Sequence, residues 1–261
     1  MIHAASGFRS PESKERQIKP ENMEGTPKRK VLIVGGSRGL GLALAGNFGS
    51  NGWETTVLSR TAPHITDIKA EIILADATTK AAAKRYLREI EPNLLVINFA
   101  QGIYKHPELL EDSEVELIIE TNAASVIGWV TAAIQLLPAE SKIGWVNSLT
   151  ALIPDENWAL YAAAKASVNH FIECVRPAAA RRGIGITVCY PGCLQTDFHR
   201  AAGLPAGLPT ESVSPNSIVQ LMREAIEDGQ EFWAAQMDAS IVEQYYEERR
   251  RFLLKTNGGL K

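Results

Sequence analysis

The chain has 261 residues, 45% hydrophobic and 22% charged, and these proportions exclude collagen-like, disordered and disulfide-scaffold proteins. Its 27 basic and 30 acidic side chains give a net charge of -3, so we expect neither a nucleic-acid nor a membrane partner. Polar and charged residues interrupt the longest apolar runs, so no membrane-spanning segment is expected. The three cysteines are an odd number, which favours a reducing, cytoplasmic location over a disulfide framework.

Residues 1–30 form a compositional unit of their own, with dense charges, prolines and no apolar periodicity. They have neither the apolar stretch of a secretory signal nor the acid-poor composition of a mitochondrial presequence. We therefore predict a flexible N-terminal tail over 1–30, a single dinucleotide-binding and catalytic domain over 31–235, and a C-terminal helical extension over 236–261.

From Val31 onward, short β-branched runs alternate with helical patterns, which predicts βαβ units on a parallel sheet. Continuous apolar strands require helices on both faces of the sheet, so the predicted fold class is a doubly wound, Rossmann-type α/β fold. The expected strands are 31–34, 54–58, 72–74, 94–98, 143–147 and 184–190, with a possible edge strand at 231–235. The expected helices are 39–51, 78–90, 114–137, 157–182, 215–228 and 238–254.

Two segments depart from this regular alternation. Residues 61–75 show no helical period, so the second crossover is predicted to be a loop. Pro177 lies inside the helix at 157–182 and removes the hydrogen bond to the carbonyl of Glu173, at a cost of roughly 3 kcal/mol if uncompensated. We expect a kink or an early end there.

In the terminal helix, the charged run 247–251 is predicted to be a solvated face.

A glycine-rich turn follows the first strand and leads into an apolar helix. Glycines let the backbone approach a pyrophosphate without a Cβ in the way, and the helix N-terminus supplies N–H groups and a positive dipole for the anion. A glycine turn without function is the alternative, which the position directly after the first strand disfavours. The residues of this predicted phosphate site are Gly35, Gly36, Ser37, Arg38, Gly39, Leu40 and Gly41.

Tyr161 and Lys165 lie four residues apart, on one face of an expected helix. A nearby cation favours the phenolate and lowers a tyrosine pKa from about 10 toward the working range of an acid–base catalyst. By itself this pair is more often two unrelated residues on a helix surface. Ser148 follows the strand at 143–147, at the sheet edge where open α/β folds bind ligands, so three polar groups converge there.

Together these residues resemble the classical short-chain dehydrogenase/reductase family, from Val31 to about Phe198. The family's TGxxxGxG turn is similar to 34–41, with Val34 in place of the threonine. Its NNAG segment is similar to 98–101, where Phe99 and Gln101 depart from the pattern, and its PGxxxT segment is similar to 191–196. The family's serine, tyrosine and lysine match Ser148, Tyr161 and Lys165, and its helix asparagine matches Asn122.

The resemblance implies hydride transfer between a nicotinamide and a small-molecule carbonyl or alcohol. In these implied roles Tyr161 is the general acid or base, Ser148 holds the carbonyl oxygen, and Lys165 lowers the Tyr161 pKa and binds the nicotinamide ribose. Asn122 holds a water molecule, the alternative being an asparagine bonded to backbone. Trp158 and Phe198 are expected beside the substrate, with core packing as an even alternative.

The cofactor-binding residues implied by the same resemblance share one sheet edge. Asp76, which ends the third strand, is expected to contact the adenine, or alternatively to cap the next helix. The full set is Gly35, Ser37, Arg38, Gly39, Leu40, Gly41, Arg60, Asp76, Ala77, Asn98, Ala100, Tyr161, Lys165, Leu194 and Thr196.

The end of the second strand predicts NADP rather than NAD. Proteins that bind NAD normally carry an acidic residue there for the ribose hydroxyls, whereas this chain has Ser59 and Arg60. Arg60 and Arg38 can each offer a planar guanidinium to a 2′-phosphate. The alternative is that both arginines are solvated and indifferent to the cofactor.

The resemblance also implies a homodimer or homotetramer paired through the helices at 114–137 and 157–182. Histidines and cysteines show no ligand spacing, so no metal is expected. Two other functions remain open: a non-catalytic NADP-binding regulatory protein, and an isomerase or dehydratase on the same fold. The presence of all four catalytic residues disfavours the first, and the lack of a longer substrate domain disfavours the second.

Overall fold

A computed structural model describes residues 28–64, 68–79, 81–205, 212–235 and 239–257, so most of the predicted tail lies outside the described residues. In this part of the chain, a seven-stranded parallel sheet has the order β3-β2-β1-β4-β5-β6-β7. The predicted doubly wound α/β fold is confirmed. The strands are β1 Lys30–Val34, β2 Glu54–Ser59, β3 Glu71–Leu74, β4 Leu94–Ile97, β5 Lys142–Val146, β6 Gly185–Tyr190 and β7 Phe232–Ala234.

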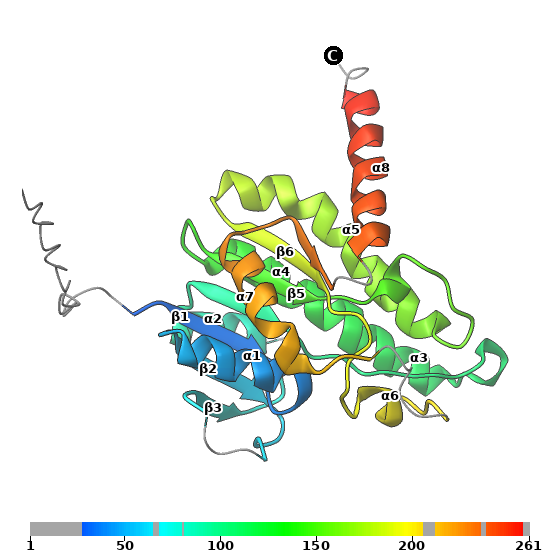
Figure 1. The fold of residues 1–261 in the computed structure, drawn as a ribbon, viewed down its shortest axis with the longest axis horizontal. Coiled ribbons are helices and arrows are strands. Elements are labelled where there is room, and N and C mark those ends of the chain that lie inside the picture. Colours follow the sequence, from blue (N-terminus) through cyan, green and yellow to red (C-terminus); the bar gives the residue numbers. More distant parts are fainter. Residues whose placement is uncertain (1–27, 65–67, 80, 206–211, 236–238, 258–261) are drawn as a thin grey trace, which may run out of the picture.

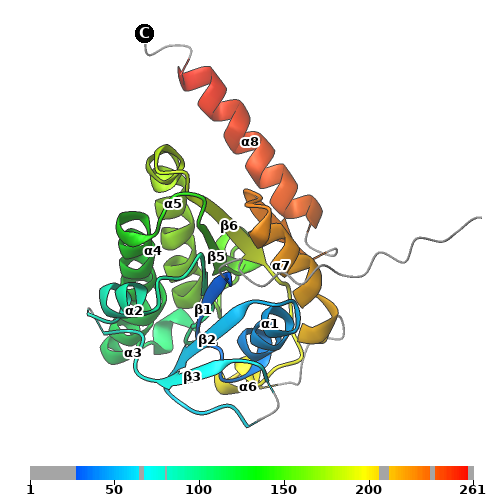
Figure 2. The same cartoon turned by 90° about the vertical axis from the view of Figure 1, so that its left-hand side faces the viewer.

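Helices cover both faces of the sheet, because the buried strands offer apolar side chains to both sides. One hydrophobic core joins the sheet to α2, α4, α5 and α8, and a second joins it to α1 and α7 (Figures 1 and 2). The helices are α1 Gly39–Ser50, α2 Ala82–Ile90, α3 Asp112–Ile119, α4 Ser125–Leu136, α5 Ala159–Arg181, α6 Phe198–Ala201, α7 Val219–Glu227 and α8 Ala239–Asn257.

The boundaries of several elements differ from the predictions. The helix expected at 114–137 is divided into α3 and α4 by a π-helical turn over Glu120–Ala124. The helix expected at 78–90 begins only at Ala82. The described residues between β2 and β3 contain no helix, which confirms the predicted loop, and β7 confirms the edge strand.

Pro177 does not end its helix, because α5 continues to Arg181. The predicted early end of this helix at Pro177 is therefore wrong. Contacts with the sheet hold this part of the helix in place: the Arg176 guanidinium donates to the carbonyls of Ile186 and Glu231, and Ala179 is buried. Tertiary packing offsets the loss of one helical hydrogen bond.

The helical run Asp112–Leu136 is long and apolar enough to cross a bilayer by length and composition, contrary to the expectation that no segment reaches this length. Half of its most apolar window is buried inside the fold. Trp129 and Val130, for example, pack fully into the core. The run therefore has the burial of a core helix in an α/β fold.

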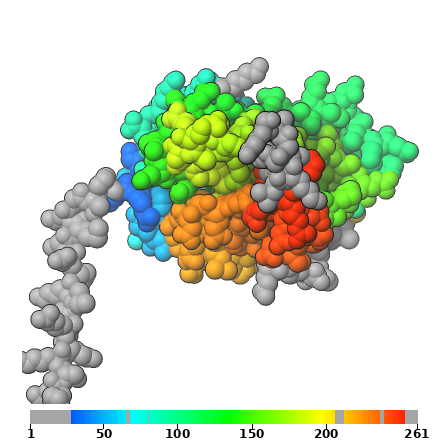
Figure 3. Space-filling model, turned by 90° about the horizontal axis from the view of Figure 1, so that it is seen from above, coloured from blue at the N-terminus to red at the C-terminus, as the bar shows by residue number. Residues whose placement is uncertain are grey.

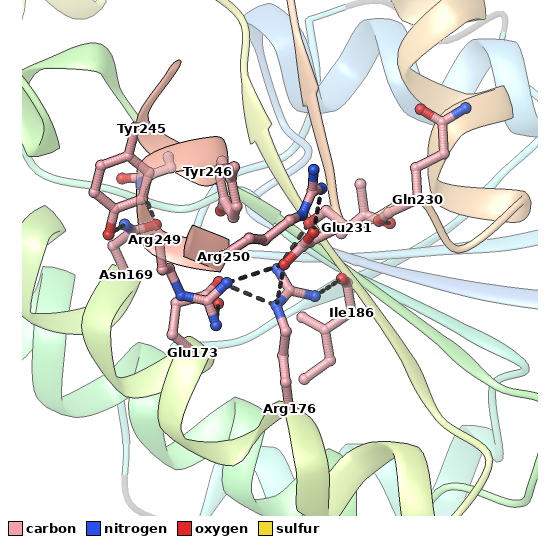
Figure 4. Close-up of polar contacts among 12 residues, drawn as sticks. Asn169, Glu173, Arg176, Ile186, Gln230, Glu231, Tyr245, Tyr246, Arg249 and Arg250 are labelled. Atoms are coloured by element: carbon pink, nitrogen blue, oxygen red, sulfur yellow. Dashed lines mark hydrogen bonds and ion pairs between the residues drawn. The ribbon is translucent and has the colours of Figure 1, made fainter. Parts of the chain in front are cut away.

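The last helix, α8, leaves the body of the molecule at its far end (Figures 1 and 2), while its first turns pack against the edge strand β7. In Figure 3 the red atoms of α8 lie beside the orange segment that contains α7 and β7. The solvated face predicted at 247–251 is wrong for Arg249, whose side chain is only 20% exposed, whereas the Arg250 side chain remains 52% exposed. Arg249 forms ion pairs with Glu173 of α5 and with Glu231, and Arg250 pairs with Glu231 at 2.6 Å (Figure 4). These ion pairs depend on the tertiary structure, because both carboxylates come from distant parts of the chain.

Candidate active site

A cavity of about 830 Å³ opens at the carboxyl ends of the strands. It lies where the strand order reverses between β1 and β4, the place where doubly wound folds bind ligands. Fifteen of the predicted catalytic and cofactor-binding residues line it. Gly41 and Asn122 do not, nor does Gly36 of the predicted phosphate site. Those that do are Gly35, Ser37, Arg38, Gly39, Leu40, Arg60, Asp76, Ala77, Asn98, Ala100, Ser148, Tyr161, Lys165, Leu194 and Thr196.

The glycine turn is packed directly against the end of β4. A Cβ at Gly41 would lie 2.2 Å from the carbonyl oxygen of Gly35 and 2.5 Å from Nδ2 of Asn98. That amide in turn donates to the Gly35 carbonyl at 2.6 Å. Gly35 itself has a φ of +89°, which favours glycine. Gly41 does not line the cavity, but its lack of a side chain lets the glycine turn pack closely against the start of α1.

The first turn of α1 is suited to an anion. The first N–H groups of a helix have no partners within it, and the helix dipole places positive potential there. Arg38 occupies the N-cap position without a side-chain cap, and the first turn contains no acidic residue. Gly39 and Leu40 of this turn line the cavity, so the geometry fits the phosphates of a dinucleotide.

Two exposed arginines lie at one end of the cavity. Arg38 comes from the glycine turn and Arg60 from the end of β2, and a 3.2 Å hydrogen bond between the hydroxyls of Thr61 and Ser37 joins these two segments. In the described part of the chain, neither guanidinium has a hydrogen-bond partner. Both are therefore available to a bound anion.

Asp76 both lines the cavity and caps a turn. Its carboxylate accepts from the backbone N–H of Thr78 at 2.9 Å and from the hydroxyl of Thr78 at 2.7 Å. These bonds, helped by the charge of Arg60, hold the pKa of Asp76 below its usual value. This turn lies before α2. Asp76 therefore caps the turn, and not the first turn of the helix as the alternative prediction had it.

Tyr161 and Lys165 are both buried in the wall of the cavity, at 6% and 2% exposure. The ammonium nitrogen of Lys165 donates to the carbonyl of Val146 at 2.8 Å and lies 5.7 Å from the centre of the Tyr161 ring. Burial lowers the pKa of Lys165 to about 7. Burial also raises the pKa of Tyr161, against the opposing effect of a hydrogen bond to Ser148. Desolvation thus dominates the pKa of Tyr161, and the expected lowering of this pKa by Lys165 stays a prediction.

Ser148 follows β5 in an extended conformation and begins a short helical turn over Leu149–Ala151. Its oxygen accepts from the backbone N–H of Thr150 at 3.3 Å and from the hydroxyl of Thr150 at 3.0 Å. Thr150 therefore does not use the Ser148 proton, which is available to the Tyr161 oxygen, as in the hydrogen bond between these two side chains, or to a substrate oxygen in the cavity.

Asn122 is fully buried in the π-helical turn. Its side chain accepts from the N–H of Gln101 at 2.8 Å and donates to the carbonyl of Gln101 at 2.7 Å. This reciprocal pair agrees with the alternative of an asparagine bonded to backbone. The predicted water contact stays a prediction.

Aromatic side chains surround Tyr161 at the other end of the cavity. Phe198 lines it, and Trp158 stacks on Phe198 at 6.1 Å with an angle of 7° between the rings. Trp158 also contacts the Tyr161 ring at 5.3 Å. Phe99 and His199 line the cavity too and were not predicted. Their only sequence signal is adjacency to predicted residues.

Histidine, cysteine and acidic side chains do not gather into a metal-binding group anywhere in the described ranges. None of the three cysteines, at 174, 189 and 193, is part of a disulfide bond.

Comparison with known proteins gives consistent results. The family model for short chain dehydrogenases matches residues 29–205. The 3-oxoacyl-(acyl-carrier-protein) reductase FabG of Escherichia coli (strain K12) is 30% identical over 209 residues, covering 72% of this chain and 84% of that protein. The 3-dehydrosphinganine reductase TSC10B of Arabidopsis thaliana is 25% identical over 181 residues, covering 62% and 54%.

Two solved structures show the same fold. A short-chain dehydrogenase from Sphingobium yanoikuyae in complex with NADPH has a TM-score of 0.74 and 18% identity, covering 87% of this chain and 95% of that one. BdcA in complex with NADPH has a TM-score of 0.67 and 19% identity, covering 79% and 91%.

Proposed function

Since this chain belongs to the short-chain dehydrogenase family, we propose that it is an NADP(H)-dependent oxidoreductase acting on a carbonyl or alcohol substrate. The observation that carries the proposal is one cavity with an anion-binding turn and two arginines at one end, and Ser148, Tyr161 and Lys165 at the other. The NADPH held by both solved relatives supports the choice of cofactor.

NADP is favoured over NAD by the charges around the end of β2. Ser59 stands where an acidic residue would bind the ribose hydroxyls of NAD, and its hydroxyl donates to the carbonyl of Thr61 at 2.8 Å. Arg38 and Arg60 line the cavity nearby and can pair with a 2′-phosphate. The glycine turn would hold the pyrophosphate.

When bound, the nicotinamide supplies or accepts the hydride. In the direction of reduction, Tyr161 donates its phenolic proton to the carbonyl oxygen, and burial keeps this phenol protonated until the substrate arrives. Ser148 donates a second hydrogen bond to the same oxygen and stabilises its developing negative charge. Lys165, with a pKa of about 7, can carry a proton at neutral pH and return it to Tyr161. The aromatic wall suits an apolar carbonyl compound.

The proposed assembly is a homodimer or homotetramer paired through α4 and α5. The outward face of α4 carries Gly128, with Ala124 at the end of the preceding π-helical turn, and that of α5 carries Ala163 and Ser167, all exposed. A Cβ at Gly128 would meet nothing within 4 Å. Small exposed residues on both helices let two backbones approach closely. The lack of a disulfide bond among the three cysteines agrees with the proposed cytoplasmic location.

The test is consumption of NADPH with a panel of carbonyl probes: diacetyl, phenanthrenequinone and an acetoacetyl thioester. The wild-type protein should consume NADPH with at least one probe, whereas Tyr161→Phe should bind NADPH with unchanged affinity and fail to turn over. A protein that binds NADPH and reduces no probe would favour the regulatory alternative. A Tyr161→Phe variant that keeps more than about a tenth of the wild-type rate would remove Tyr161 as the acid.

A further inference from the structure

Asn169 is a buried polar side chain on α5, four residues after Lys165, with 2% exposure. Its oxygen accepts from Nδ2 of Asn147 at 3.1 Å and from the hydroxyl of Tyr190 at 2.8 Å. Its amide donates to the hydroxyl of Tyr245 at 3.2 Å, a pair seen in Figure 4. One side chain therefore joins α5, β6, α8 and the end of β5.

The α8 end of this connection is itself firmly held. Tyr246 is fully buried, stacks on Phe232 of β7 at 4.5 Å and lies 3.4 Å from the Tyr190 hydroxyl. About one turn further, Arg249 and Arg250 form the ion pairs with Glu173 and Glu231 described above (Figure 4). The hydroxyl of Tyr245 thus has a fixed position relative to the sheet.

The other end of the connection reaches the active site. Asn147 lines the cavity and stands between Val146, whose carbonyl accepts from Lys165, and Ser148. Its backbone N–H donates to the carbonyl of Cys189 at 2.8 Å, and its side chain is held by Asn169. A shift of Asn147 would therefore move the partners of two catalytic side chains at once.

We infer that α8 is a positioning element of the active site, acting through Tyr245, Asn169 and Asn147 on the strand end that presents Ser148. The inference rests on the proposed function. A network of buried hydrogen bonds fixes the geometry of the groups that it joins more narrowly than apolar packing does. Displacements well below 1 Å already slow a reaction that depends on alignment.

Tyr245→Phe removes one hydroxyl from this connection and keeps the ring. With NADPH and phenanthrenequinone, kcat should fall about three- to tenfold, while KM for NADPH stays within about twofold, because alignment is lost and binding is not. Hydrogen exchange measured by mass spectrometry should rise in the segment 143–149.

Two variants of α8 serve as controls. Glu243→Gln changes an exposed side chain and should leave kcat and exchange unchanged. Arg250→Ala removes an ion pair to Glu231 at 2.6 Å, so it weakens the attachment of α8 without touching Asn169. It should lower stability toward urea only slightly, since partly exposed ion pairs contribute little. It should leave kcat within about twofold, because Asn169 keeps all its hydrogen-bond partners.

The inference is overturned if Tyr245→Phe leaves both kcat and exchange in 143–149 at wild-type values. It is equally overturned if Arg250→Ala reduces kcat as much as Tyr245→Phe does, because the effect would then follow stability alone. If the wild-type protein reduces no probe, the proposed function fails. The exchange of 143–149 then decides the inference by itself: a rise confined to Tyr245→Phe supports it, and no rise contradicts it.

Discussion

Replacing Lys165 by methionine should make the protein without ligand more stable while abolishing its activity. Lys165 is almost completely buried, and desolvation lowers its pKa from 10.5 to about 7. At about 1.4 kcal/mol per pKa unit, burying the charged form costs up to roughly 5 kcal/mol below pH 7. Methionine fills a similar volume without charge and gives up one hydrogen bond, to Val146, worth about 1 kcal/mol. We therefore expect a gain of a few kcal/mol.

The sign of the pH dependence follows from proton binding. Between pH 7 and 10.5 the unfolded wild-type chain holds a proton on Lys165 that the folded protein does not, so wild-type stability rises with pH in this window. Below this window, the full free-energy cost of burying the charged ammonium opposes folding, and above the window this cost is absent. The advantage of Lys165→Met should accordingly be greatest at about pH 6 and disappear toward about pH 10.

Urea denaturation of both proteins at about pH 6, 8 and 10, followed by tryptophan fluorescence, measures this difference. Lys84→Met, which replaces an exposed lysine on α2, is the matched control and should change stability little at any pH. A Lys165→Met protein that is less stable than the wild type at low pH, or whose advantage does not vary with pH, would refute the reasoning.

Three further predictions concern the cofactor and the assembly. Gly41→Ala places a Cβ 2.2 Å from the Gly35 carbonyl, so the turn must shift, and equilibrium dialysis should show NADPH binding weakened at least about tenfold; wild-type affinity would mean that the turn does not shape the site. Arg38→Ala and Arg60→Ala should each reduce kcat/KM for NADPH about tenfold and leave NADH unchanged, because each exposed guanidinium contributes one charge-assisted contact to the 2′-phosphate. An equal loss for both cofactors would contradict this role. Light scattering at micromolar concentration should give two or four times the 28.5 kDa mass of the chain, and a monomer mass would exclude the proposed pairing.

Much of the fold could be predicted because its signals are local. The apolar runs of β1 and β4 and the helical patterns between strands are each read within a few residues, and the parallel direction of the strands follows from the βαβ connections. The glycine turn and the spacing of Tyr161 and Lys165 likewise identify the site without knowledge of packing.

The features that could not be predicted depend on distant residues. Asn122 lies within a π-helical turn that no sequence pattern predicted. It forms its two hydrogen bonds with Gln101, which is 21 positions away in the sequence. Arg249 appeared solvated because Glu173 meets it only in the folded chain. Lys165 was expected to lower the pKa of Tyr161, but burial of the phenol raises this pKa and dominates, and burial is a property of the whole fold.

The central claim, hydride transfer assisted by Tyr161, is tested most directly by following deuterium from NADPH labelled at the transferable position of the nicotinamide. With a carbonyl probe that the wild-type protein reduces, mass spectrometry should find one deuterium on the carbon of the new alcohol, and Tyr161→Phe should bind the labelled NADPH and form almost no product. Alcohol without deuterium, or labelled alcohol formed equally fast by Tyr161→Phe, would contradict the account.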